Sequence, residues 1–92
     1  GKKAAYIKIN GEIWYNKGIK NADKVINAYY SSIVEAVSTY FQNMTLEEAR
    51  QPEKKQTAKK ELKDILNKMI NESEKYEYNY IYDIIFDEWF YQ

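Results

Sequence analysis

The sequence predicts a single α+β domain in which an N-terminal antiparallel β-hairpin, alone or with a third strand, packs on three to four α-helices. Three observations predict this class. The dipeptide Asn10-Gly11 separates two short apolar runs, residues 21–44 repeat apolar side chains at helical spacing, and residues 45–48 have the form of a helix-capping signal. With 92 residues the chain can build one core but not two, so residues 1–92 are expected to fold as one unit.

The first predicted element is the hairpin. Residues 4–9 and 12–16 flank Asn10-Gly11, the dipeptide best suited to a two-residue type I′ turn. Both faces of such a hairpin are partly apolar, so one should pack on a helix and the other needs a cover, a third strand or a partner. Its open edges can also accept a partner strand.

The central element is a helix over residues 21–44, with Asn21 as N-cap and Asp23 in the first turn. Its buried stripe comprises Ala22, Val25, Ile26, Tyr29, Ile33, Ala36, Val37, Tyr40 and Met44. The opposite side is weakly polar and carries Glu35 as its only charge. Either a second element covers this side or it faces a partner.

Two helical segments should follow. Thr45 and Glu48 form a capping box for a short helix that ends near Arg50. Pro52 disfavours helical geometry at the residue before it, so the chain should bend there and restart with Pro52 as the first helical residue. The buried side of this longer helix is expected to hold Ala58, Leu62, Ile65, Leu66, Met69 and Ile70.

The last segment, residues 74–92, fits two structures. Tyrosines at 76, 78, 80 and 82 alternate as in a strand. A helical stripe is also present, formed by Tyr78, Ile81, Tyr82, Ile85, Phe86 and Trp89. Its regular spacing without a helix breaker favours a helix from about Tyr78 onward. The alternative is a strand over residues 76–82 that joins the hairpin as its third member.

The composition argues against catalysis. The chain has no His and no Cys, which removes the usual general base, the thiol nucleophile and most transition-metal ligands. On the helix interpretation Asp83 and Asp87 lie one turn apart beside Glu88, but a hard cation needs more fixed oxygens, so we interpret them as a solvated acidic face. We therefore predict a protein that is not an enzyme and has no cofactor or metal. Without a long apolar run or signal-type segment, it should be cytoplasmic.

A net charge of zero conceals an asymmetric distribution. Residues 1–24 hold six lysines and two acids, whereas residues 71–92 hold six acids and one lysine. Large aromatic side chains among acids suit a patch that docks on a basic groove, which predicts partner-binding residues at Asp83, Asp87, Glu88, Phe90 and Tyr91. An alternative nucleic-acid-binding face comprises Lys54, Lys55, Lys59, Lys60 and Lys63.

Three features together resemble the small proteins carried by phages and mobile elements of low-GC bacteria. They are the bias toward Lys, Ile, Asn and Tyr, the stretch YIKINGEIWYNKG leading into a helix, and the acidic aromatic tail. Among these proteins the anti-CRISPR type is the most similar in kind: compact, without catalytic groups, and often acidic where it blocks a nucleic-acid channel. The similarity is one of class, and no functional residue carries over from it.

The leading hypothesis is therefore a non-enzymatic protein-binding module. It would be a stoichiometric inhibitor whose acidic aromatic tail occupies a basic site on a nucleic-acid-handling enzyme, such as a CRISPR effector nuclease. Two alternatives remain open. One is a small DNA- or RNA-binding regulator that uses the Lys54 to Lys63 face, and the other is a structural homo-oligomer, a homodimer for example, joined by the hairpin edge or the weakly polar helix face.

Overall fold

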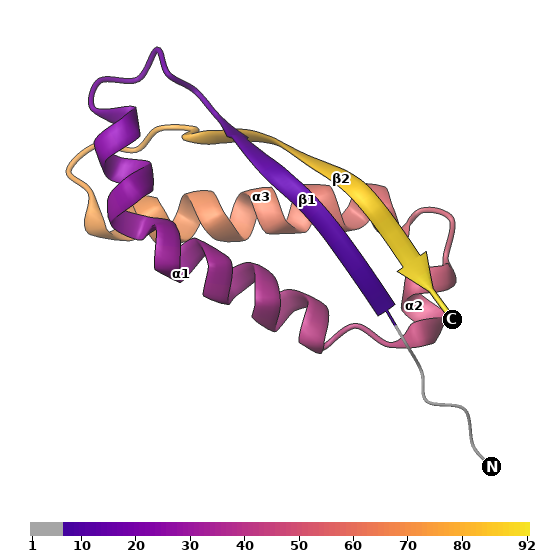
Figure 1. Ribbon diagram of the computed structural model, residues 1–92. Coiled ribbons are helices and arrows are strands. Elements are labelled where there is room, and N and C mark those ends of the chain that lie inside the picture. Colours follow the sequence, from indigo (N-terminus) through magenta and orange to yellow (C-terminus); the bar gives the residue numbers. More distant parts are fainter. Residues whose placement is uncertain (1–6) are drawn as a thin grey trace.

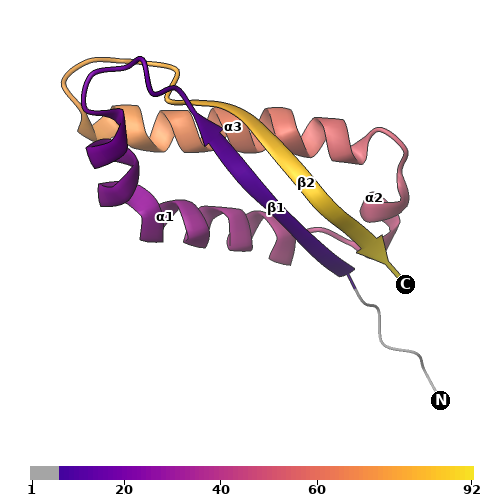
Figure 2. The ribbon, with the colours of Figure 1, turned by 45° about the horizontal axis from the view of Figure 1, so that its top comes forward.

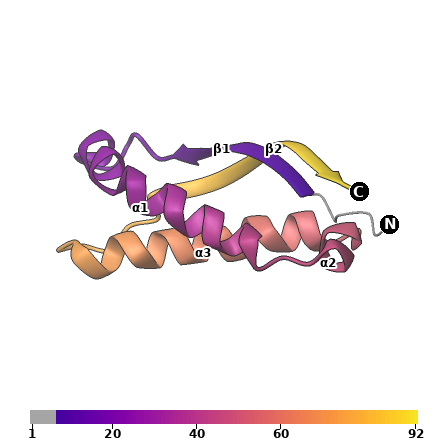
Figure 3. The same cartoon turned by 60° about the horizontal axis from the view of Figure 1, so that its bottom comes forward.

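The computed structural model describes residues 7–92 and has two layers, a two-stranded antiparallel sheet above a pair of long helices (Figure 1). The element order is β1 (Ile7–Tyr15), α1 (Ala22–Gln42), α2 (Leu46–Arg50), α3 (Lys54–Ser73) and β2 (Ile81–Tyr91). Both strands lie on the same side of α1 and α3, and the short α2 lies at the end of the molecule where β2 finishes (Figures 2 and 3). The α+β class is confirmed, with three helices in the described part of the chain.

β1 runs without a break through Asn10-Gly11, where the sequence predicted a turn. Neither residue has the positive φ that a type I′ turn requires. The partner of β1 is β2, from the other end of the chain, with Ile9 opposite Trp89. The predicted hairpin is therefore wrong, because pairing with β2 keeps this dipeptide extended. Residues 4–6 of the predicted first strand lie outside the described residues.

β2 is a strand where the sequence favoured a helix. Its register with β1 has two irregularities, at which Tyr82 and Asp87 have no opposite residue. These are β-bulges, each adding one residue to β2. The inward positions are therefore unevenly spaced, at Ile81, Ile84, Phe86 and Trp89. Steps of three residues also occur along one face of a helix. Because of the bulges, the apolar pattern of this strand therefore resembles that of a helix. The alternative prediction of a strand in this segment is correct, but the strand covers residues 81–91 and not 76–82.

α1 occupies the predicted region, and its buried residues are Ala22, Ile26 and Ile33. Asn21 is the N-cap residue, as predicted, but it has φ 63° and its side chain makes no capping hydrogen bond. Asp23 accepts a hydrogen bond from the Tyr15 hydroxyl, which joins the first turn of α1 to the end of β1. The weakly polar side around Glu35 is exposed, and nothing within residues 7–92 covers it as the sequence had suggested.

The next two helices begin close to their sequence signals. Thr45 Oγ1 accepts the Glu48 N–H at 3.1 Å and the Glu48 side chain accepts the Thr45 N–H at 3.4 Å, which confirms the capping box. Gln51 is extended with ψ 130°, as expected for a residue before proline. α3 begins at Lys54, slightly later than the predicted start at Pro52.

α3 supplies the centre of the core. Its completely buried residues are Ala58, Leu62, Leu66 and Ile70, one on each successive turn. Met69 is half-buried, as a residue at the edge of this stripe can be. Ile65 is 43% exposed, so its predicted burial is wrong. It lines an open hollow beside Ala36 and Thr39 of α1, because the two helices do not close over it.

Two asparagines on α3 hold the segment that leads into β2. The Asn67 side chain donates to the carbonyl of Ile81 and accepts its N–H, both at 2.8 Å. One turn later Asn71 donates to the carbonyl of Tyr78 at 3.0 Å and accepts its N–H at 3.1 Å. Each amide group therefore pairs with the main chain as a neighbouring strand would, which fixes where β2 begins.

Candidate functional site

The outer face of the sheet, turned away from the helices, carries exposed aromatic side chains. Trp14 of β1 and Tyr82 of β2 are 46% and 45% exposed, and their rings meet edge to face with centroids 6.3 Å apart. Phe90, farther along β2, is 45% exposed. Aromatic side chains gathered on one exposed face are typical of protein-binding surfaces, so this outer face is the candidate site.

Charged side chains of the two strands surround these aromatic groups. Trp14 Nε1 donates to Glu12 Oε1 at 2.8 Å. Across the sheet, Glu88 Oε1 accepts a hydrogen bond from Asn10 Nδ2 at 2.7 Å and lies 3.6 Å from Lys8 Nζ. Aromatic groups with a polar margin of this kind match the composition of protein interfaces.

The sequence predicted a partner-binding cluster of Asp83, Asp87, Glu88, Phe90 and Tyr91, and the structure brings only part of it together. Asp83 lies opposite Trp14, Glu88 opposite Asn10 and Phe90 opposite Lys8, which places these three on the outer face. Asp83 also accepts the N–H of Ile84 at 2.8 Å. The three acids do not share the helical face that was predicted, because β2 is a strand.

The remaining two residues of that predicted cluster are not paired with an outer-face residue of β1. Asp87 is the unpaired residue of a bulge, and Tyr91 pairs with Ile7 at the end of the sheet. Sequence reasoning missed Trp14 and Tyr82 as site residues. The alternation of β1 places Trp14 on the face of Lys8 and Glu12, but the bulge at Tyr82 breaks the alternation of β2. The proximity of Trp14 and Tyr82 could be predicted only by knowing that the two strands are neighbours.

The five lysines of the alternative site, Lys54, Lys55, Lys59, Lys60 and Lys63, do not form a uniform exposed patch. Lys60 is exposed, whereas the other four are half-buried. Lys54 points back to α1 and α2, with its Nζ 5.3 Å from the ring centroid of Tyr40 and 3.7 Å from Glu48 Oε2. The Lys54 ammonium group therefore interacts with side chains of its own chain.

The pKa of Lys54 agrees with these intramolecular contacts. Burial alone would lower the pKa of the Lys54 ammonium, but the Tyr40 hydroxyl and the nearby carboxylates of Glu61 and Glu48 outweigh it and raise that pKa. Burial raises the pKa of the Tyr40 hydroxyl, which donates to Glu61 Oε2 at 2.9 Å. Tyr40 thus remains a neutral donor between a cation and a carboxylate, and the network joins α1, α2 and α3.

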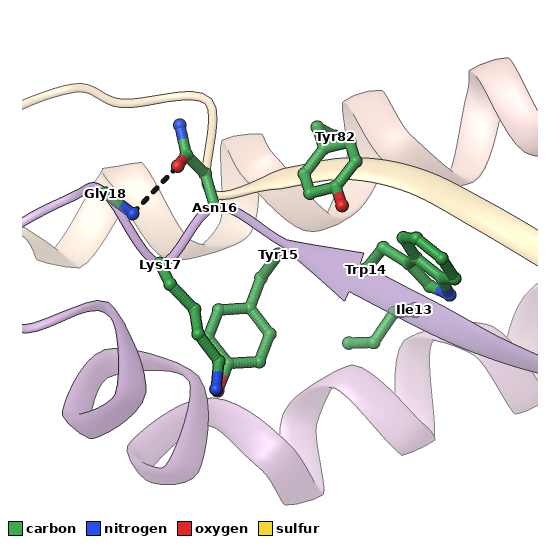
Figure 4. Close-up of a pocket in the computed structure, with 7 residues that line it drawn as sticks. All are labelled: Ile13, Trp14, Tyr15, Asn16, Lys17, Gly18 and Tyr82. Atoms are coloured by element: carbon green, nitrogen blue, oxygen red, sulfur yellow. Dashed lines mark hydrogen bonds between the residues drawn. The ribbon is translucent and has the colours of Figure 1, made fainter.

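Two hollows adjoin the sheet. The first, of about 560 Å³, is shallow and lies at the end of β1, where Tyr15 points toward α1 while Trp14 and Tyr82 lie over the strands (Figure 4). The second, of about 400 Å³, is an apolar groove between β1 and α1. Within residues 7–92 no group of three or more acidic side chains is arranged to hold a metal ion. In the same range no helix is long and apolar enough to span a membrane.

A two-layer α+β domain with an exposed aromatic sheet face is the class of protein that these observations define. The chain belongs to the FliL family, because the family model described as flagellar basal body-associated protein FliL matches residues 1–92. No curated protein and no solved structure matches the chain.

Membership of this family overturns several expectations from the sequence. The resemblance to anti-CRISPR proteins of phages and mobile elements is wrong, and so is the inhibitor of a nucleic-acid-handling enzyme. The family is described by its association with the flagellar basal body, which also contradicts a freely cytoplasmic protein and gives no support to a nucleic-acid regulator or a structural homo-oligomer. The resemblance rested on residue usage and an acidic aromatic tail, which unrelated proteins can share.

Proposed function

We propose that this chain is a non-enzymatic component of the flagellar basal body that binds another basal-body protein through the outer face of its β1–β2 sheet. The family description supports the location and the association. We choose this surface because Trp14 and Tyr82 are exposed there and in contact with each other, with Phe90 on the same face.

The physical argument rests on what an interface gains from aromatic groups. Trp and Tyr supply large contact areas at low cost in side-chain entropy, and they are enriched among residues that dominate binding energy. Their ring faces here are only partly covered by each other, because the contact between Trp14 and Tyr82 is edge to face. A partner can therefore bury much of both rings, and that burial would drive association.

The margin of this face indicates the charge of the partner. Glu12, Asp83 and Glu88 surround the aromatic groups, and Lys8 is the only basic side chain of β1 and β2. An acidic margin favours approach of a basic surface and disfavours nucleic acid. Asp83, Glu88 and Phe90 thus keep their proposed role in partner binding, while the partner is a basal-body protein.

The test is recovery of the chain with purified basal bodies from flagellated cells. We expect the double variant Trp14→Ala with Tyr82→Ala to be recovered about tenfold less than the unmodified chain, because two central contacts are lost. Tyr76→Ala is the matched control, since Tyr76 is 59% exposed but lies in the loop before β2. Equal recovery of the double variant, with an unchanged circular dichroism spectrum, would contradict the proposed surface.

A further inference from the structure

The two edges of the sheet differ where β2 begins, because there the main chain of the β2 side is paired with side chains of α3. The segment entering β2 is paired with the side chains of Asn67 and Asn71 on α3. β1 has β2 on one side, and within residues 7–92 no strand lies on its other side. Nor does any side chain in that range pair with the main chain of β1 as Asn67 does with β2. An edge of this kind is a template for another extended chain.

The alternation of main-chain groups along β1 shows which of them point to the open edge. The N–H of Asn16 donates to the carbonyl of Tyr80 at 2.8 Å, so this position faces β2. Both bulges are on β2, so β1 itself alternates regularly. The main-chain groups of Ile9, Gly11 and Ile13 therefore face away from β2, in a row that an extended segment can satisfy.

An apolar groove of about 400 Å³ lies beside this edge, between β1 and α1. Apolar residues of its walls include Ile9, Ile13, Tyr30, Val34, Val37 and Phe41. Tyr30 is 60% exposed and Val34 is 46% exposed, so the α1 side of the groove lacks a cover. A third strand beside β1 would cover it.

We infer that the open edge of β1 and this groove bind an extended segment of a partner protein, which adds to the sheet as a third strand. The inference goes beyond the proposed function, because it concerns the edge of the sheet and not its outer face. A helix does not fit this role, since its main-chain groups are already paired. The partner segment needs aliphatic residues at alternate positions, directed into the groove.

The charges of β1 specify the rest of the partner segment. Lys8 and Glu12 lie on the outer face, so an added strand would place side chains directly beside them. Charge complementarity calls for an acidic residue beside Lys8 and a basic residue beside Glu12. In an antiparallel segment the basic residue comes first, and the acidic residue follows four positions later.

The probe is the synthetic peptide Val-Lys-Val-Thr-Val-Glu-Val with blocked ends, titrated into the labelled chain and followed by amide NMR. We expect shift changes along β1 and at Val34, and about fivefold tighter binding than for the peptide with Lys and Glu exchanged. The double variant Lys8→Glu with Glu12→Lys should reverse this preference. Absence of binding, or a preference that the double variant does not alter, would overturn the inference.

A matched pair of substitutions distinguishes binding of the peptide at the groove from nonspecific binding to exposed apolar residues. Val34→Lys should weaken binding of the peptide by about tenfold, because a charge would enter the groove. Ile65→Lys should leave binding unchanged, since Ile65 is similarly exposed at 43% but lines the hollow on the other side of α1. Equal effects of both substitutions would show that the peptide does not use the groove.

Sedimentation of the chain without peptide tests whether a second copy of the chain, and not a partner segment, occupies the β1 edge. A monomer whose amides at Ile9, Gly11 and Ile13 exchange with solvent, and become protected only when peptide is added, supports an open edge. A dimer in which the amides of Ile9, Gly11 and Ile13 are already protected would assign the edge to a second copy and overturn the inference. Both results are independent of basal-body recovery, which tests the outer face.

Discussion

Gly11 has no side chain at a point where β1 passes close to the main chain of β2. A Cβ built on Gly11 would lie 2.5 Å from the carbonyl oxygen of Ile85 and 3.2 Å from Cδ1 of Phe86. The first contact is with main chain, which cannot move aside as the end of a flexible side chain can. Glycine is needed here for the close approach of two strands and not for a left-handed turn.

Replacement of Gly11 by Ala should therefore destabilise the protein by about 2 kcal/mol, the cost of forcing an extra carbon into a packed region. The measurement is the free energy of unfolding from urea denaturation. Gly18→Ala is the control, because its nearest contact would be the Asn16 side-chain oxygen at 3.1 Å and its φ is not positive. If both substitutions have the same small effect, the close approach at Gly11 does not limit stability.

At the scale of single elements, α2 shows how a short helix is held in place. It spans only Leu46–Arg50, too few residues to be stable in isolation. The capping box begins it, and the hydrogen bond from Trp89 Nε1 to the Ala49 carbonyl, at 3.0 Å, joins it to β2. The backbone and side-chain hydrogen bonds from Thr45, together with Lys54, lower the pKa of the Glu48 carboxyl.

Loss of the cap through Thr45→Ala should cost about 1 kcal/mol of unfolding free energy at neutral pH. Thr39→Ala, at an exposed position inside α1, should have little effect. Because the pKa of Glu48 is lowered in the folded state, its stabilising contribution is present above its unfolded value of 4.5 and is lost as the pH falls through the folded value.

The pH dependence of stability therefore provides a second readout. We expect the difference between the unmodified chain and Thr45→Ala to shrink when denaturation is measured at pH values below 4.5. We also expect the pKa of Glu48, followed by NMR, to rise in the variant. A difference in stability that stays constant across this range would show that the Glu48 charge does not contribute through the cap.

At the scale of the whole molecule, the two layers meet on one row of α3 side chains. Leu62 is completely buried and lies beside Ile33 of α1 and Ile84 of β2. Around it the core is extended by an aromatic group in which Phe41, Phe86 and Trp89 meet edge to face. Because a domain of this size has a small total stability, a defect at this point should affect the complete fold.

Leu62→Ala should lower the unfolding free energy by about 3 kcal/mol and unfold the sheet and helices together. Ile65→Ala on the same helix should cost less than about 1 kcal/mol, since Ile65 is 43% exposed. Urea denaturation followed both by far-ultraviolet circular dichroism and by tryptophan fluorescence measures this. Separate transitions for the two signals would contradict a single core.

Several parts of the fold were predictable from the sequence because their causes are local. The stripe from Ala22 to Tyr40 specified α1, and the pair Thr45 and Glu48 specified the start of α2. The buried row of α3 was also predictable, apart from Ile65 at its margin. Of the candidate site, the sequence predicted only Asp83, Glu88 and Phe90. It predicted them because aromatic and acidic residues are mixed in this segment, and it placed them on a helix, whereas they lie on a strand.

By itself, then, the sequence determined the positions of the helices, the α+β class and the row of α3 side chains in the core, since these follow from spacing and capping within a few residues. Only the tertiary structure decided that Asn10-Gly11 is extended and that residues 81–91 form a strand. The two strands are separated by more than 60 residues of chain, and their pairing depends on the helices that bring them together. The outer face and the open edge of β1 arise from that pairing, and no local pattern contains it.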